Sequence, residues 1–286
     1  MRLTGIEVDG RICVGYVRSG SVTSLGALDE FWRDPDTACR RVTGGRTYRL
    51  DEIRLVPALP STAKIICIGV NYKAHAEESG AELPKVPVVF ARWRETLIAD
   101  GEPSPAMDPY YDWEAELGVV IGKGGLAIPD TKAFDHVFGY CTFNDLSARS
   151  LQMESSQWAL GKNSDRSGPI GLIVSADEAG NPADGWRVTT RVNGVLMQDG
   201  ITSDLIFTVP ELIAFVSRSM TLLPGDLIIT GTPSGIGLSQ QPPVVLKPGD
   251  KVVVEVGSLG TVTTPIVAPP QTFDRVDPIT TATHSA

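Results

Sequence analysis

Residues 110–122 read YYDWEAELGVVIG, an apolar β-strand pattern that begins with closely spaced carboxylates. Glu114 and Glu116 share one face of this predicted strand with Gly118 and Val120, roughly 6–7 Å apart along it. If these glutamates are buried, a proton, an Arg or Lys, or a metal ion must offset their repulsion. Alternate positions form the other face, which we expect to be buried: Trp113, Ala115, Leu117, Val119 and Ile121.

A third carboxylate would complete a site for a hard metal ion. Asp145 is the best candidate, because it follows the apolar run in CTFNDLSAR at 141–149, where a strand end would present it. Mg²⁺ and Mn²⁺ prefer oxygen ligands and often keep several waters, so few protein ligands suffice. The alternative interpretation is an edge strand whose glutamates are solvated.

Composition narrows the class of protein. The chain has 286 residues, of which 42% are hydrophobic and 21% charged, as in ordinary globular proteins. Its net charge of −9 and its lack of a large basic cluster argue against a nucleic-acid partner. No run approaches the ~20 apolar residues of a membrane span, and no signal peptide is visible. Cys13, Cys39, Cys67 and Cys141 are scattered, which fits a reducing cytoplasm.

Gly and Pro punctuate many short strand patterns, which favours a mainly β fold with few helices. We place a boundary near Ser61, after a segment that mixes strands with a helix-like stretch at 28–42. A short helix is expected in NYKAHAEESG, ending at Gly80, and an amphipathic helix in TVPELIAFVSRSM at 208–220. Pro-Gly-Asp at 224–226 and 248–250 predicts two turns that enter strands.

His75 and Glu78 are three residues apart in the first of these helices, so their side chains share a face. A carboxylate beside an imidazole orients it and raises its basicity, as a general base requires. The alternative is a solvated surface pair. A glycine-containing turn precedes this helix, and such an exposed helix suits a mobile lid.

The glycine-rich stretch ITGTPSGIGLS at 229–239 lacks the endings of both a P-loop and a dinucleotide loop. It could still bring Thr232 and backbone N–H groups near an anion. Lys162 lies in a loop pattern, either solvated or directed at a substrate carboxylate. Arg149 and Gln152 follow Asp145 on one helical face, either near the proposed metal or on the surface.

In this order, these segments resemble the fumarylacetoacetate hydrolase family over about residues 64–267. The resemblance rests on seven motifs: IGVNYKAHAEESG (68–80), DWEAELGVVIGKG (112–124), GYCTFNDLSAR (139–149), QWALGKNSDRSGPIG (157–171), RVNGVLMQDG (191–200), LLPGDLIITGTPSGIG (222–237) and LKPGDKVVVEV (246–256). It implies a mainly β protein with some α structure. A mixed β-roll or sandwich catalytic domain would span 61–268, after a small N-terminal α+β domain at 1–60 and before a flexible tail at 269–286.

The resemblance also implies a homodimer that binds Mg²⁺ or Mn²⁺ through Glu114, Glu116 and Asp145. It implies His75 and Glu78 as a catalytic dyad on a lid. Lys162 would join them in catalysis, and further side chains would contact a small anionic keto acid: Arg149, Gln152, Thr232 and Arg92. Arg92, Ser150 and the segment 162–165 depart from the common family pattern, which leaves the substrate open.

The reaction expected from this resemblance is hydrolysis of a C–C bond in an acylpyruvate or related 2,4-diketo acid, such as a fumarylpyruvate-like or fumarylacetoacetate-like compound. The products would be pyruvate and a carboxylic acid. Decarboxylation of an oxaloacetate-type acid, isomerisation of a 2-hydroxy-diene-dioate and a ureidoglycolate-lyase reaction are alternatives on the same site. A non-catalytic keto-acid binder is a further alternative, which the intact His75, Glu78 and acidic residues disfavour.

Overall fold

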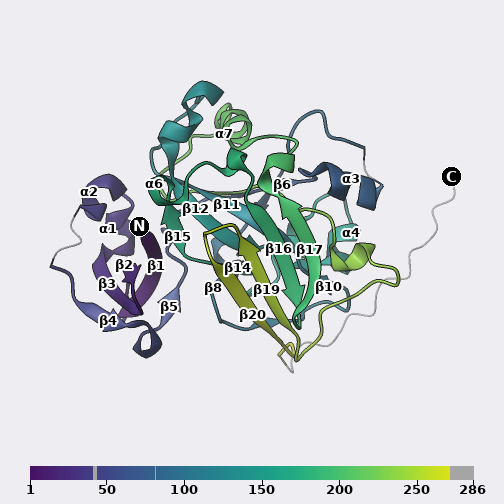
Figure 1. The fold of residues 1–286 in the computed structure, drawn as a ribbon, viewed down its shortest axis with the longest axis horizontal. Coiled ribbons are helices and arrows are strands. Elements are labelled where there is room, and N and C mark those ends of the chain that lie inside the picture. The colour runs from purple at the N-terminus through teal and green to yellow at the C-terminus, as the bar shows by residue number, and fades with distance from the viewer. Residues whose placement is uncertain (41–43, 81, 271–286) are drawn as a thin grey trace.

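The computed structural model describes residues 1–40, 44–80 and 82–270. Strands predominate over helices, as the sequence predicts (Figure 1). The strands are β1 (Arg2–Val8), β2 (Arg11–Arg18), β3 (Ser21–Ala27), β4 (Thr47–Arg49), β5 (Leu55–Val56), β6 (Ile65–Gly69), β7 (Val88–Arg92), β8 (Leu97–Ala99), β9 (Ser104–Pro105), β10 (Tyr111–Asp112), β11 (Ala115–Ile121), β12 (Val137–Asn144), β13 (Ser147–Ala148), β14 (Gly168–Ile170), β15 (Ile173–Ser175), β16 (Arg187–Val192), β17 (Val195–Ile201), β18 (Leu227–Ile229), β19 (Lys251–Val256) and β20 (Thr261–Val267).

The helices are short. The α-helices are α1 (Leu28–Phe31), α2 (Pro35–Cys39), α3 (Lys73–Ser79), α4 (Arg149–Met153), α5 (Ala159–Lys162), α6 (Ala176–Ala179) and α7 (Val209–Ser217). Short 3₁₀ helices cover Leu50–Glu52, Arg94–Thr96, Asp130–His136, Pro182–Asp184, Thr202–Asp204 and Gly237–Ser239.

The main sheet runs in the order β4-β3-β2-β1-β15-β12-β11-β18-β6-β7. It is mixed, because β11 is antiparallel to both of its neighbours while β18 and β6 are parallel. The N-terminal strands stand to one side in Figure 1, yet β1 pairs with β15, with Leu3 opposite Ile173. The first sixty residues therefore extend the main sheet, and the predicted boundary falls in the connector between β5 and β6.

A second sheet, in the order β17-β16-β19-β20-β9, forms a layer beside the main sheet (Figure 1). The predicted apolar face of β11 is confirmed, because all of its members belong to the core shared with this second sheet and α7. Leu117 and Val119 of β11 join Val188 and Val254 of the second sheet in that core. The opposite face of β11 is also buried, so Glu116 lies inside the protein.

The other face of the main sheet carries the N-terminal helices. Phe31 and Trp32 share a core with Val120 and Cys141. The predicted helix-like stretch at 28–42 consists of two helices, because Pro35 starts α2 and the Asp34 side chain caps it by accepting from a backbone N–H. Residues 41–43 lie outside the described part of the chain.

Both Pro-Gly-Asp turns are confirmed as entries to strands. Asp226 accepts a hydrogen bond from the N–H of Leu223 at 2.7 Å, and β18 follows. Asp250 accepts from the N–H of Lys247 at 2.9 Å, and β19 follows. In each turn the aspartate closes the chain back onto the residue three positions earlier, which fixes where the next strand starts.

The two predicted helices are also present. α3 ends at Gly80, whose φ of 66° is a left-handed conformation that glycine adopts without strain. α7 begins with a capping box between Thr208 and Glu211. Leu212, Ile213 and Val216 form the buried face of α7, whereas Phe215 is only half-buried and packs beneath the guanidinium of Arg218 at 4.1 Å.

Within the described residues, no helix is long and apolar enough to cross a membrane. The four cysteines are free thiols. The predicted flexible tail at 269–286 lies outside the described residues from position 271 onward.

Candidate functional site

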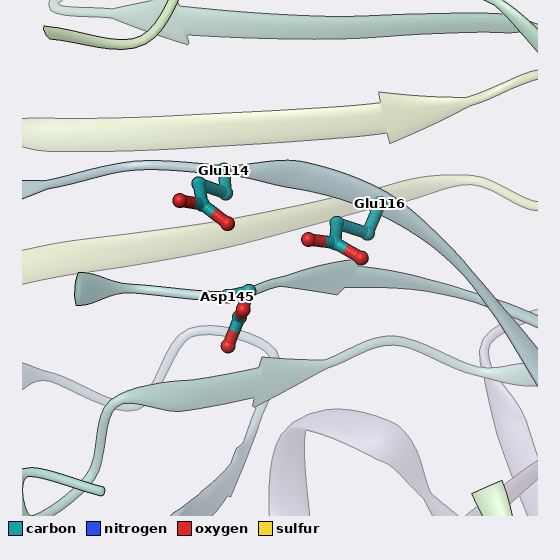
Figure 2. Close-up of side chains that lie close together, drawn as sticks. All are labelled: Glu114, Glu116 and Asp145. Carbon is teal, nitrogen blue, oxygen red and sulfur yellow. The ribbon is translucent and has the colours of Figure 1, made fainter. Parts of the chain in front are cut away.

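Antiparallel pairing of β11 and β12 brings the predicted carboxylates together. Ala115 lies opposite Asn144, and the N–H of Asp145 donates to the carbonyl of Glu114 at 2.9 Å. One oxygen from each of Glu114, Glu116 and Asp145 lies within 4.8 Å of the others, and all three side chains are buried. Figure 2 shows the three side chains together, with Glu116 on β11, Glu114 just before it, and Asp145 just after β12.

Lys162, at the end of α5, joins two of these carboxylates. Its Nζ lies 2.7 Å from Oε2 of Glu114 and 2.7 Å from Oδ2 of Asp145. Burial opposes the charge of this ammonium, but Asp145 and Glu114 outweigh that effect and raise the pKa of Lys162 above its usual value. The predicted loop lysine is thus a buried cation beside the cluster.

Arg149 holds Glu114 from the other side. Its guanidinium donates to Glu114 at 2.6 Å and to Asp112 at 2.9 Å, and to Oε1 of Gln152 at 2.9 Å. Burial alone would raise the pKa of Glu114, but Lys162 and Arg149 hold it below its usual range. The surface alternative for Arg149 is therefore wrong.

Arg92 was predicted to contact the substrate, but its side chain contacts other residues of the protein instead. Its buried guanidinium pairs with Asp145 and also donates to Ser167 at 2.6 Å and to the carbonyl of Leu146 at 3.0 Å. It does not line the cavity described below. Such a position suits a residue that fixes Asp145, and the sequence could not show it, because the pair joins segments 53 residues apart.

Among the three clustered carboxylates, Glu116 is the one whose negative charge is not balanced by an ion pair with a Lys or Arg in the described part of the chain. In the described part of the chain, no Lys or Arg forms an ion pair with it; the N–H of Gly231 donates to it at 2.5 Å. Burial, and then the charges of Asp145 and Glu114, raise its pKa well above the usual value. A divalent cation among these oxygens would supply the missing positive charge, so the residues fit Mg²⁺ or Mn²⁺.

His75 and Glu78 lie together on α3, as predicted. Nδ1 of His75 is 3.5 Å from Oε2 of Glu78, and His75 lines the same cavity as Glu114 and Glu116. The N–H of Gly235 donates to both oxygens of Glu78, at 2.9 and 3.1 Å. The glycine-rich loop therefore holds the carboxylate that contacts the imidazole.

The N–H groups of this loop bind the protein's own carboxylates. Besides Gly231 and Gly235, the N–H groups of Gly237 and Leu238 donate to Asp112, at 2.7 and 3.0 Å. Thr232 lines the cavity, and its hydroxyl donates to the carbonyl of Ala115 at 2.9 Å. The loop thus positions the site by binding its carboxylates.

A cavity of about 410 Å³ opens onto these residues. The predicted site residues that line it are His75, Glu114, Glu116, Arg149, Gln152, Lys162 and Thr232. Asp145 lies behind them, fully buried.

Sequence reasoning missed three residues here. Asp112 had a signal, since it alternates with Glu114 and Glu116 in DWEAE. Phe90 and Trp158 also line the cavity, and nothing local in the sequence marked them.

Several known proteins are similar to this chain in sequence or in fold. Oxaloacetate tautomerase YisK of Bacillus subtilis is 42% identical over 229 residues, which cover 78% of this chain and 76% of that protein. The structure of fumarylacetoacetate hydrolase from Exiguobacterium antarcticum has a TM-score of 0.78 at 32% identity, covering 94% of this chain and 100% of that one. Fumarylpyruvate hydrolase from Pseudomonas aeruginosa, solved with Mn²⁺ and pyruvate, has a TM-score of 0.67 at 32% identity, covering 76% and 92%.

The model of the fumarylacetoacetate (FAA) hydrolase C-terminal family matches residues 64–267. These residues include every predicted site residue, from His75 to Thr232, and both strands that carry the carboxylates. This chain belongs to the fumarylacetoacetate hydrolase family.

Proposed function

We propose that this chain is a divalent-metal-dependent enzyme that acts on a 2-keto acid through its enolate, and that the reaction is keto–enol tautomerisation. The observation that carries the proposal is the buried cluster of Glu114, Glu116 and Asp145, which adjoins a cavity also lined by His75. The 42% identity to an oxaloacetate tautomerase supports this choice of reaction.

Glu114, Glu116 and Asp145 would hold Mg²⁺ or Mn²⁺, since buried carboxylate oxygens are the ligands these ions prefer. The bound ion would act as a Lewis acid that polarises the keto group and lowers the energy of the enolate. Lys162 stays positively charged beside these carboxylates, so its ammonium adds to the positive field that stabilises developing negative charge.

His75 would move the proton. In the forward direction its imidazole accepts a proton from C3 of the keto acid, and that C–H electron pair becomes the C2–C3 double bond. The carbonyl electron pair moves to the oxygen, which then receives a proton, so the enol and the keto form have the same atoms. Glu78, 3.5 Å from Nδ1, orients the imidazole for both transfers.

Hydrolysis of a C–C bond in an acylpyruvate is the second candidate, and the contact between His75 and Glu78 favours it. An imidazole oriented by a carboxylate can deprotonate a water as well as a C–H group. The attacked acyl group would leave as a carboxylic acid, and the other fragment would leave as a pyruvate enolate. Decarboxylase, isomerase and lyase reactions would share that enolate or its metal site.

Product analysis on metal-free protein supplied with Mg²⁺ or Mn²⁺ tests the proposal. The panel contains freshly dissolved enol oxaloacetate, acetylpyruvate, fumarylpyruvate and ureidoglycolate. We expect metal-dependent loss of enol absorbance without release of CO₂ or a second acid. Pyruvate with a second acid would establish the hydrolase instead, and CO₂ or glyoxylate would indicate a decarboxylase or lyase. If Glu116→Gln in a chelator turned over substrate as fast as wild type supplied with metal, every metal-dependent candidate would be contradicted.

A further inference from the structure

We propose that the substrate carries an apolar group beyond C3 of the 2-keto acid, and that this group lies against an aromatic wall formed by Phe90 and Trp158. This inference rests on the proposed function, because it places the 2-keto acid end at the carboxylate cluster. It goes further by ranking 2-keto acids: one with an apolar far end should bind more tightly than one that ends in a second carboxylate, such as oxaloacetate.

The aromatic wall adjoins the charged end of the cavity. Trp158 directly precedes α5, and its carbonyl accepts from the N–H of Lys162 at 3.0 Å. The rings of Phe90 and Trp158 meet edge-to-face with centroids 5.4 Å apart, and Nζ of Lys162 is 5.4 Å from the centroid of Phe90. A molecule bound near Lys162 is therefore within reach of the wall.

The backbone is shaped to hold Trp158 in place. A Cβ at Gly69 would lie 2.4 Å from the Trp158 ring, so the ring rests where another residue would put its side chain. Gly69 and Phe90 belong to the paired strands β6 and β7, which makes the support rigid. The aromatic wall is thus a rigid part of the cavity: the Trp158 ring packs on the backbone at Gly69, and Phe90 belongs to a strand paired with β6.

The Lys and Arg side chains that line the cavity leave no unpaired counterion for a second carboxylate. Among the described residues that line it, the Lys and Arg side chains are Lys162 and Arg149, and both are already paired with Glu114. Taking a carboxylate out of water without a partner is strongly unfavourable. Ile68, Met153, Ile236 and Leu238 complete an apolar lining that suits a hydrocarbon group.

Calorimetry with inert analogues tests this inference without turnover. N-propyloxamate and N-oxalylglycine share the oxamate head of a 2-keto acid mimic, but the first ends in a propyl group and the second in a carboxylate. Oxalate reports on the carboxylate cluster alone. In the presence of Mn²⁺ we expect N-propyloxamate to bind at least about tenfold more tightly than N-oxalylglycine, since each buried methylene contributes roughly a fourfold gain.

Variants assign the preference to the aromatic wall. Trp158→Ala should remove most of the preference for N-propyloxamate and leave oxalate binding unchanged, while Trp158→Phe should keep much of it. Trp93→Ala is the matched control, because Trp93 is 53% exposed and lies outside this cavity. Circular dichroism confirms that each variant is folded.

The outcomes separate this inference from the proposed function. If oxalate binds with Mn²⁺ but N-oxalylglycine binds as tightly as N-propyloxamate, the apolar substrate is wrong and the proposed function stands. A preference that survives in Trp158→Ala would likewise overturn the apolar substrate alone. If oxalate does not bind even with Mn²⁺, the proposed function fails, and the inference fails with it.

Discussion

Nζ of Lys162 lies 2.7 Å from Oε2 of Glu114, in the wall of the cavity that also contains His75. The same ammonium lies 2.7 Å from Asp145, and Arg149 donates to Glu114 as well. Buried cations thus neutralise two of the three clustered carboxylates without any metal. Glu116 is left as the carboxylate that requires a proton or a divalent ion.

Lys162→Met should weaken both folding and turnover. It leaves Glu114 and Asp145 without their shared cation, and removing one partner from a buried pair costs about 3–5 kcal/mol of unfolding free energy. Turnover should fall on the order of 10²–10³ as the stabilising charge is lost. Urea denaturation in a chelator measures the first effect. Lys132→Met, which alters a largely exposed lysine, is the control. If Lys162→Met were as stable as wild type, the ion pairs of Lys162 with Glu114 and Asp145 would be contradicted.

Glu116→Gln should stabilise the metal-free protein at neutral pH and remove the response to Mn²⁺. The substitution keeps the shape of the side chain but removes an acid whose charged form is disfavoured by burial and by Asp145 and Glu114. Thermal unfolding should show a higher Tm than wild type in a chelator, and little further rise when Mn²⁺ is added. A variant that Mn²⁺ stabilises as strongly as wild type would exclude Glu116 as a ligand.

The pH dependence of metal-free stability follows from the same group. The pKa of Glu116 is raised in the folded protein, so its contribution to stability is fully present below its unfolded pKa of about 4.5. That contribution is lost as the pH rises through the folded pKa. Wild type in a chelator should therefore lose stability with rising pH relative to Glu116→Gln. The stabilisation by Mn²⁺ should grow over the same range, because the ion displaces a proton.

Arg92→Lys should lower stability without changing substrate preference. Lysine keeps the charge beside Asp145 but cannot also donate to Ser167 and to the carbonyl of Leu146, a loss of about 1–3 kcal/mol. Because Arg92 lies outside the cavity, the ratio of kcat/KM for two substrates should equal the wild-type ratio. A changed ratio would restore the substrate-contacting role that the sequence suggested.

Glu78→Gln separates the two candidate reactions. The amide oxygen can still accept from the N–H of Gly235, but the charge that supports an imidazolium at His75 is lost. Water attack in hydrolysis depends on that charge more than transfer of an already acidic C3 proton does. We expect a loss of about 10²-fold in any acylpyruvate hydrolysis and a smaller loss in tautomerisation. If the rates of hydrolysis and tautomerisation fell equally, both reactions would depend to the same extent on the charge of Glu78 beside His75.

Much of the carboxylate cluster could be predicted because local rules determine it. Strand alternation puts Glu114 and Glu116 on one face, and a position just after a strand presents Asp145 at the adjacent strand end. Turn chemistry likewise predicts the starts of β18 and β19.

The parts that could not be predicted depend on contacts between distant segments. Arg92 pairs with Asp145 across 53 positions, and Lys162 reaches Glu114 across 48. Pairing of β1 with β15 is more remote still, with Leu3 opposite Ile173, so the sequence could not place the N-terminal segment in the main sheet. The homodimer stays a prediction, which light scattering in solution can check.

The metal centre can be tested by titrating the metal-free protein with Mn²⁺ and following the free ion by electron paramagnetic resonance. We expect wild type to bind one Mn²⁺ tightly per chain, Mg²⁺ to displace that ion, and Glu116→Gln to bind none. Saturable binding that is unchanged in Glu116→Gln, or no binding to wild type, would contradict a metal centre at Glu114, Glu116 and Asp145.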